Sequence, residues 1–237
     1  FALVTAFESR YESIRERIAA AASRSGRKSS GIELMAVTKT RPVMELEEAW
    51  GAGIRLFGEN RVQEAAEKIL AWPSVKVADW RLIGHLQRNK ARKAVALFSR
   101  IESLDRFELA LELQRLLEEK EERMDTLIEV NTSGEASKHG VPPEGLELLL
   151  EQVLQACPRL GVKGFMTIGP IGGNLAGTAK AFALLRELRD RNASSLGLVF
   201  PELSMGMSDD FEVAIEQGST CVRLGRALFG PREYREG

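Results

Sequence analysis

Short apolar runs alternate along the chain with longer segments in which apolar residues recur every three or four positions. The short runs have the length and composition of buried β-strands, and the longer segments have the period of amphipathic helices. Because the connections between them are short, the pattern is typical of a parallel sheet covered by helices. We predict eight strands, at residues 32–39, 54–58, 80–84, 100–104, 126–131, 161–167, 202–206 and 220–224.

Eight strand and helix units favour a single closed (β/α)8 TIM barrel over an open, doubly wound sheet. The sequence has 237 residues, a usual size for one such barrel, and no low-complexity linker divides it. We therefore predict one α/β domain over residues 1–237, with an extra helix ahead of the first strand. The apolar face of that helix comprises Phe7, Tyr11, Ile14, Ile18 and Ala21.

Local signals predict where two later helices begin. Asp105 and Glu108 have the spacing of a capping box, so a helix is expected to start there. Ser208, followed by two aspartates, predicts a second start, and Gly218 predicts the end of that helix. The stretch 167–174 contains several glycines and a proline, which forbid regular structure. It is either a lid over the rim of the barrel or an ordinary long connection.

Lys39 is the first residue that suggests chemistry, because it ends an apolar run shortly before Pro42. Alternate side chains of a strand share a face, so Met35, Val37 and Lys39 would point the same way. This arrangement would place Lys39 at the carboxyl-terminal rim, which is the active face of barrel enzymes. The alternative is a solvated lysine at a strand end.

A second group of residues predicts an anion site on the same rim. Ser204 and Gly206 follow strand seven, and Gly225 follows strand eight just before a short helical segment. Loops at these two places form the usual phosphate site of barrels, and glycines let backbone amides approach an anion closely. A lysine and a phosphate cradle on one rim fit pyridoxal 5′-phosphate (PLP), whose aldehyde would form a Schiff base with Lys39.

Composition excludes several classes of function. Lysine and arginine number 33 against 34 acidic residues, a net charge of −1, so no overall field favours nucleic acid or an acidic membrane. No run of about 18 apolar residues predicts a membrane span. Two cysteines, Cys157 and Cys221, are too few for a disulfide framework, so we expect a cytoplasmic setting. His85 and His139 are far apart in the sequence and lack metal-ligand spacing, so no metal site is predicted.

Six segments stand in the order and at the spacing of a barrel: Ala36-Val37-Thr38-Lys39, Phe57-Gly58-Glu59-Asn60-Arg61-Val62-Gln63-Glu64, His85-Leu86-Gln87-Arg88-Asn89-Lys90, Gly164-Phe165-Met166-Thr167, Ser204-Met205-Gly206-Met207-Ser208 and Arg223-Leu224-Gly225. Together they resemble the pyridoxal phosphate homeostasis proteins. The resemblance implies a barrel similar to the N-terminal domain of alanine racemase, with PLP held on Lys39. It also implies a protein that stores PLP, limits the free aldehyde and delivers the cofactor to apo PLP-dependent enzymes.

The resemblance assigns residues around the cofactor as well. Asn60 would lie beside the ring, and Arg223 would face the pyridine nitrogen. The implied phosphate ligands are Ser204, Gly225 and the amide of Arg226. The rest of the predicted cofactor-binding set is His85, Met166 and Gly206. Position 226 departs from the small hydroxyl residue that is commoner in the family, so only its backbone amide or its guanidinium would serve the phosphate there.

The sequence favours a binding protein over an enzyme. A cation such as Arg223 beside the pyridine nitrogen disfavours its protonation and weakens the ring as an electron sink. Racemisation needs a proton donor opposite the lysine, commonly a tyrosine, and neither Tyr11 nor Tyr234 is expected on the rim. We also expect the β domain of the racemases to be missing, and hence a monomer. The alternatives are a PLP-dependent, racemase-like enzyme of amino acids and an aldolase-like barrel in which Lys39 attacks a sugar phosphate without PLP.

Overall fold

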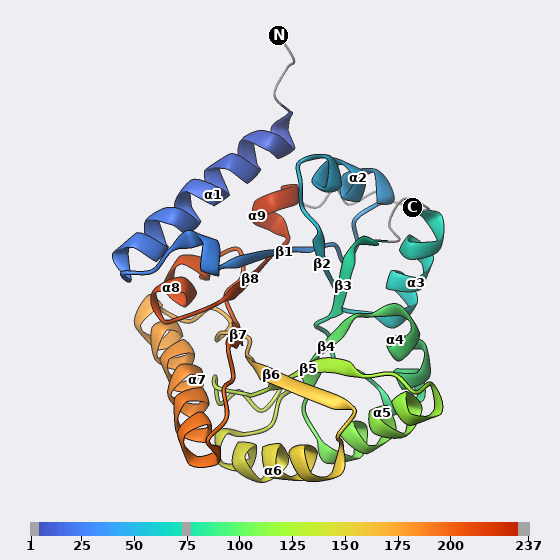
Figure 1. Cartoon of the computed structure of the whole chain (residues 1–237). Helices are drawn as coiled ribbons and strands as arrows, with labels where there is room; N and C mark the ends of the chain where they lie inside the picture. The colour runs from blue at the N-terminus through green and yellow to red at the C-terminus, as the bar shows by residue number, and fades with distance from the viewer. Residues whose placement is uncertain (1–4, 73–76, 232–237) are drawn as a thin grey trace.

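Eight parallel strands close into a barrel in the computed structural model, which describes residues 5–72 and 77–231 (Figure 1). Each strand pairs with the next in the sequence, and β1 pairs with β8 to complete the ring. The strands are β1 (Glu33–Val37), β2 (Leu56–Glu59), β3 (Asp79–Leu82), β4 (Arg100–Leu104), β5 (Met124–Glu129), β6 (Leu160–Met166), β7 (Glu202–Ser204) and β8 (Cys221–Leu224). The predicted TIM barrel and its eight strands are confirmed.

The helices follow the strands in turn and form an outer layer around the barrel (Figure 1). They are α1 (Ala6–Arg24), α2 (Val43–Gly51), α3 (Val62–Ala71), α4 (Ala91–Leu97), α5 (Phe107–Glu119), α6 (Leu146–Ala156), α7 (Leu175–Leu196), α8 (Phe211–Glu216) and α9 (Arg226–Phe229). Among the described residues, single turns of 3-10 helix lie in the connections at Ser29–Gly31, Arg88–Lys90 and Pro143–Gly145. Within the described residues, no helix has the length and apolar character that crossing a bilayer requires.

The leading helix α1 packs on the outside of the barrel, beside α8 and α9 (Figure 1). A capping box begins it, because the Thr5 hydroxyl accepts from the Glu8 amide and the Glu8 carboxylate accepts from the Thr5 amide. Its predicted apolar face is confirmed: Phe7, Ile14, Ile18 and Ala21 are buried, and Tyr11 is partly buried. The Arg10 guanidinium donates to the Leu228 carbonyl at 2.8 Å and so ties α1 to α9.

The capping box predicted at Asp105 is wrong. Helix α5 begins after Arg106, without a side-chain cap, because the Asp105 carboxylate accepts from Arg106 at 2.5 Å and faces His85 instead. The later helix α8 begins at Phe211, three residues beyond Ser208. It ends at Glu216 with Gln217 as its C-cap, two residues before the predicted end at Gly218, where a φ of +105° favours glycine.

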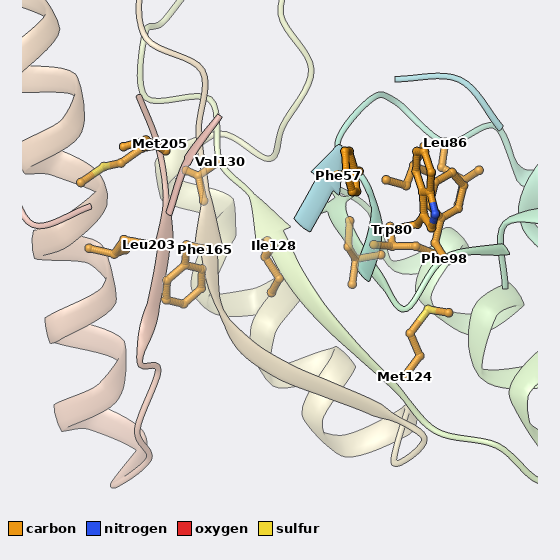
Figure 2. Packing of buried hydrophobic residues seen from close by; sticks show 14 of the residues in the cluster. Phe57, Trp80, Leu86, Phe98, Met124, Ile128, Val130, Phe165, Leu203 and Met205 are labelled. Atoms are coloured by element: carbon orange, nitrogen blue, oxygen red, sulfur yellow. The ribbon is translucent and has the colours of Figure 1, made fainter. Parts of the chain in front are cut away.

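The main hydrophobic core fills the space between the strands and the outer helices. Figure 2 shows part of it, from Phe57 and Trp80 at one side of the view to Leu203 and Met205 at the other. The Phe57 ring stacks on Trp80 with the ring centroids 5.3 Å apart, and Trp72 meets Phe57 edge-on at 5.8 Å. Burying each such side chain stabilises the fold by about 1.5–3 kcal/mol, so this layer is the chief source of stability.

The inside of the barrel holds a small apolar cluster and a chain of polar side chains. The cluster comprises Met35, Val37, Leu56, Ile83 and Cys221. The polar chain runs from Arg81 through Glu102 and Ser204 to Arg223, and all four side chains are buried. Bulky branched residues usually fill this space. Buried charged side chains hold one another in position but lower stability. This compromise is common at functional sites.

Gly84, just after β3, allows the closest backbone approach that affects the site. A Cβ added there would lie 2.2 Å from the Asn60 carbonyl oxygen, a contact that only a backbone shift could relieve. We expect Gly84→Ala to lower the free energy of unfolding by about 1–3 kcal/mol or more, measured by urea denaturation. Gly51→Ala is the matched control, because its added Cβ would meet nothing within 4 Å. Equal stability of the two variants would contradict this reading of Gly84.

Candidate cofactor site at the carboxyl rim

Lys39 lies in a tight turn, not on the first strand. β1 ends at Val37, so the predicted strand 32–39 extends two residues too far at its carboxyl end. The Arg41 amide donates to the Thr38 carbonyl at 3.0 Å and closes a four-residue turn with Lys39 at its second position. Thr40, the third residue, has a φ of +62°, which is unfavourable for a β-branched side chain. The turn, and not strand alternation, therefore sets the position of Lys39.

Three charged side chains hold this turn, and we call Glu59, Glu64 and Lys68 the turn clamp. The Lys68 ammonium donates to the Thr38 carbonyl at 2.5 Å, and the Glu64 carboxylate accepts from the Thr40 amide at 2.5 Å. Lys68 also pairs with Glu59 at 2.6 Å and with Glu64 at 2.7 Å. The peptide groups on both sides of Lys39 are thus fixed by side chains from the end of β2 and from α3.

Glu59 and Lys68 of the clamp are buried and Glu64 is partly exposed, and this difference sets their electrostatics. Glu59 is fully buried, and desolvation raises its pKa even though Lys68 and the Thr38 hydroxyl oppose the rise. Desolvation also opposes ionisation of Glu64, but hydrogen bonds from Lys68 and the Thr40 amide lower its pKa overall. A buried cation shared by two carboxylates keeps its geometry only if all three remain, because losing one partner leaves a charge unpaired.

Asn60 follows β2 directly and offers an open hydrogen-bonding position. Its side-chain oxygen is buried and has no hydrogen-bond partner among residues 5–72 and 77–231. Buried polar atoms are nearly always paired, so an orphaned one indicates a ligand or a water. The polar substituents of a pyridine ring would satisfy it. This fits the prediction that Asn60 lies beside the cofactor ring.

Arg223, on β8, is held rigidly inside the rim. Its guanidinium donates to the Ser204 hydroxyl at 2.9 Å and to the Thr167 carbonyl at 2.7 Å, and the residue is 3% exposed. The Ser204 hydroxyl in turn donates to Glu102 at 2.6 Å. Ser204 therefore has its proton engaged inside the barrel. A direct hydrogen bond from Ser204 to a phosphate stays a prediction, and it would require giving up the bond to Glu102.

Two of the predicted phosphate residues, Gly225 and Arg226, lie at the start of α9. Gly225 precedes this helix, and its first-turn amides include that of Arg226, a donor without a helical partner. The next amide, of Ala227, already donates to the Ser208 hydroxyl at 3.0 Å. The Arg226 guanidinium is exposed and pairs with Asp209, so its backbone amide is the better phosphate ligand.

Gly206 and Met166 have clear structural roles on the same rim. Gly206 has a φ of +99°, and a Cβ there would lie 2.6 Å from the Ala214 Cβ, so glycine lets α8 pack closely. Its carbonyl accepts from the Arg223 amide at 2.9 Å. Met166 ends β6 beside Ser204 and is fully buried. Cofactor contact by either residue stays a prediction.

His85 is exposed on the same rim, where it stacks on His139. The two histidines are far apart in the sequence, yet their ring centroids are 4.0 Å apart. The His85 Nδ1 atom also lies 3.3 Å from the Asp105 carboxylate. Two exposed arginines nearby form ion pairs, Arg88 with Glu112 and Arg92 with Glu119.

The loop after β6 is tied to the loop after β5. Lys138 donates to the Gly169 carbonyl at 2.6 Å, and the Ile171 amide donates to the Glu135 carboxylate at 3.1 Å. Ile171 itself is 78% exposed. Whether this loop acts as a lid or as an ordinary connection stays a prediction.

The two tyrosines are Tyr11 and Tyr234. Tyr11 lies on α1 and packs beside Phe7, away from Lys39. Tyr234 lies outside the described residues.

Glu129 is a site residue that the sequence interpretation missed. It ends β5 and is 4% exposed. Burial first and the charge of Asp105 second raise its pKa to about 7, against an opposing effect of Arg223. The available signal was an acidic residue that ends a strand of apolar residues, which in a barrel places a carboxyl group at the active rim. A carboxyl with a pKa near neutrality is suited to proton transfer.

The raised pKa of Glu129 predicts a pH-dependent stability. Between its ordinary pKa of 4.5 and about 7, the folded protein binds the Glu129 proton and the unfolded chain does not. The contribution of this proton to stability is therefore complete below pH 4.5 and lost as the pH rises through 7. We expect Glu129→Gln to raise the free energy of unfolding at pH 8, relative to wild type, by up to about 3 kcal/mol, measured by urea denaturation. The exposed Glu144→Gln is the control, and identical pH slopes for all three proteins would contradict the expectation.

Comparison with known proteins agrees with the fold. The sequence pattern of the family described as alanine racemase, N-terminal domain, matches residues 10–233, which defines the class of barrel. A pyridoxal phosphate homeostasis protein of Aquifex aeolicus is 42% identical over 225 residues, covering 95% of this chain and 98% of that protein. Its human counterpart is 39% identical over 236 residues, covering 93% of this chain and 85% of that protein. The chain belongs to the pyridoxal phosphate homeostasis protein family.

Solved structures show the same relation. PipY of Synechococcus elongatus, solved with PLP bound, has a TM-score of 0.80 and is 36% identical in sequence. The match covers 92% of this chain and 100% of the PipY chain. An alanine racemase of Clostridium difficile has a TM-score of 0.71 at 11% identity, and the match covers 94% of this chain and 60% of the racemase. That second likeness shows a shared fold alone.

Proposed function

We propose that this protein binds PLP covalently through the Lys39 amine and serves in intracellular PLP homeostasis, as a store that limits free aldehyde and delivers the cofactor. The observation that carries the proposal is the turn clamp, in which the buried Lys68 and the partly exposed Glu64 fix the peptide groups on both sides of Lys39. A solvated lysine at a strand end would need no such support. The relatives named for PLP homeostasis and the PLP-bound PipY structure support the same proposal.

The residues on the rim divide the binding among them. Lys39 would hold the aldehyde carbon, and the unpaired Asn60 oxygen would bind a polar substituent of the ring. Arg223 would face the ring nitrogen, and the amides of Gly225 and Arg226 would hold the phosphate at the start of α9. The remaining predicted contacts are those of His85, Met166, Ser204 and Gly206. When bound, PLP supplies an electrophilic carbon and an electron-accepting ring.

A binding protein agrees better with this rim than an enzyme does. Two hydrogen bonds hold the Arg223 guanidinium in place. Because arginine is a cation, it would discourage protonation of the ring nitrogen and weaken the ring as an electron sink. Within the described part of the chain, no tyrosine lies on the rim to act as the second acid or base. The aldolase-like alternative without PLP loses support, because a relative of 36% identity binds PLP.

A PLP-dependent enzyme of amino acids is the second candidate, and Glu129 is the observation that favours it. Its pKa near 7 is suited to a general acid or base at neutral pH. In this alternative, Glu129 would replace the tyrosine of the racemases. The orientation of Arg223 argues against it, and the two functions make opposite predictions for turnover.

Delivery and turnover assays on one preparation separate these functions. We expect PLP-loaded protein, freed of unbound cofactor, to activate an apo PLP-dependent enzyme in proportion to the PLP it carries. Incubation with a panel of L- and D-amino acids should yield no racemised or deaminated product. Glu129→Gln is the matched variant: turnover by wild type that this variant loses would replace the delivery proposal with the enzyme.

The setting of the protein belongs to the proposal as well. Both cysteines, Cys157 and Cys221, are buried and unpaired, which supports a reducing cytoplasm. Desolvation raises the pKa of both thiols, so neither is prepared for redox chemistry. We propose a monomer that receives PLP and meets apo PLP-dependent enzymes, without nucleic acid or membrane as partners. Light scattering of the PLP-loaded chain tests the monomer directly.

A further inference from the structure

Three side chains with metal-binding atoms meet on the rim. His85 follows β3, Asp105 follows β4, and His139 lies in the loop after β5. Their ligand atoms all lie within 4.8 Å of one another. The residues are far apart in the sequence, and the consecutive order of the three strands in the barrel brings them together. We call these three residues the histidine cluster.

The two histidine rings of the cluster face each other. They stack nearly parallel, with an interplanar angle of 16° and ring centroids 4.0 Å apart. Imidazole nitrogen is the commonest metal ligand among protein side chains. Both histidines therefore offer a ligand atom to one shared position, within 4.8 Å of the Asp105 carboxylate oxygen.

The carboxylate of Asp105 has one oxygen in use and one directed at the cluster. Its Oδ1 atom accepts from Arg106 at 2.5 Å, and its Oδ2 atom lies 3.3 Å from the His85 Nδ1 atom. The Asp105 side chain is only 9% exposed, so its orientation is fixed. Arg106 is also anchored to the Leu86 carbonyl at 2.7 Å. A ligating carboxylate held by a neighbouring hydrogen bond is the usual arrangement around protein metal sites.

We propose that the histidine cluster is a binding site for one divalent transition-metal ion of the zinc type, with His85, Asp105 and His139 as its three protein ligands. Two imidazoles and one carboxylate are a ligand set that Zn²⁺ prefers, and three protein ligands leave a fourth position for water or a small anion. Both histidines are exposed. The ion can therefore enter from solvent, and the rings can turn to bring their nitrogens to about 2.0–2.1 Å from it.

Metal binding and the proposed PLP binding require different chemical groups. Metal binding uses ring nitrogens and a carboxylate oxygen, and it does not involve Lys39 or α9. His85 is common to both proposals, because it also belongs to the predicted cofactor-binding set. The metal proposal is therefore tested by metal binding alone. Loss of PLP binding in another variant would not affect this proposal.

Titration of the full-length, PLP-loaded protein with Co²⁺ tests the site. Free PLP, which chelates metals, is removed by dialysis, and binding is followed by the visible bands of tetrahedral Co²⁺ and by competition with Zn²⁺. We expect one ion per chain. The key variant is His139→Phe, because phenylalanine keeps a ring to stack on His85 and removes the ligand nitrogen.

The expected effect of His139→Phe is a loss of affinity of at least about 100-fold, beyond the 10- to 100-fold that neighbours of a ligand typically contribute. His85→Phe should behave in the same way. Asp190→Asn, an exposed aspartate on α7, is the control and should bind as wild type does. Thermal unfolding of each variant checks that it is folded. No stoichiometric binding by wild type, or wild-type affinity in a folded His139→Phe, would overturn the proposal.

Discussion

Lys39→Ala will abolish the covalent binding of PLP while leaving the barrel folded. The Lys39 side chain is partly exposed on a turn that backbone groups and the turn clamp hold, so alanine disturbs little of the packing. The covalent bond to Lys39 contributes most of the retention of PLP, because PLP without this bond exchanges with solvent. We therefore expect the visible absorption band of lysine-bound PLP to disappear completely in the variant. Borohydride reduction of wild type should fix one cofactor per chain on the peptide that contains Lys39.

Two observations control this experiment. Lys93→Ala removes an exposed lysine of α4 that donates to the Gln63 side chain, and it should keep the band in full. Lys138 is a second lysine near the rim, so peptide mapping must separate it from Lys39. A reduced cofactor found on Lys138, or a full band in Lys39→Ala, would refute the assignment of the covalent site.

Lys68→Met will cause a large loss of stability and will loosen the turn that carries Lys39. Methionine has a similar length, but it leaves the fully buried Glu59 without its cation and the Thr38 carbonyl without one of its donors. Breaking a buried ion pair from one side costs about 3–5 kcal/mol. We expect a loss of this size in the free energy of unfolding from urea denaturation, together with weaker retention of PLP by the variant.

The double variant Glu59→Gln with Lys68→Met separates charge from packing. Removing both charges leaves no unpaired ion in the interior, so the double variant should recover part of the stability lost in Lys68→Met alone. Recovery of stability without recovery of PLP retention would show that Lys68 also positions the turn. A loss below about 1 kcal/mol in Lys68→Met, the range of surface ion pairs, would show that the clamp is not a buried network.

The sequence predicted the architecture well because the barrel is a repeated local pattern. Each strand is a short apolar run and each helix an amphipathic segment, and the short connections leave few topologies. The errors fall where tertiary contacts override local signals. Asp105 was expected to cap a helix, but His85 and Arg106 engage its carboxylate instead. The first strand was predicted to reach residue 39, but the turn clamp bends the chain after Val37.

The sequence by itself determined the eight-stranded barrel, the rim position of Lys39 and the glycines at the ends of the last two strands, because these depend on local pattern and on the order of strands. Only the tertiary structure decided what surrounds them. The pairing of Lys68 with Glu59, the raised pKa of Glu129 and the meeting of His85 with His139 all join different strands or loops. Such contacts depend on distance, burial and orientation in three dimensions, none of which is encoded in the spacing of residues along one chain.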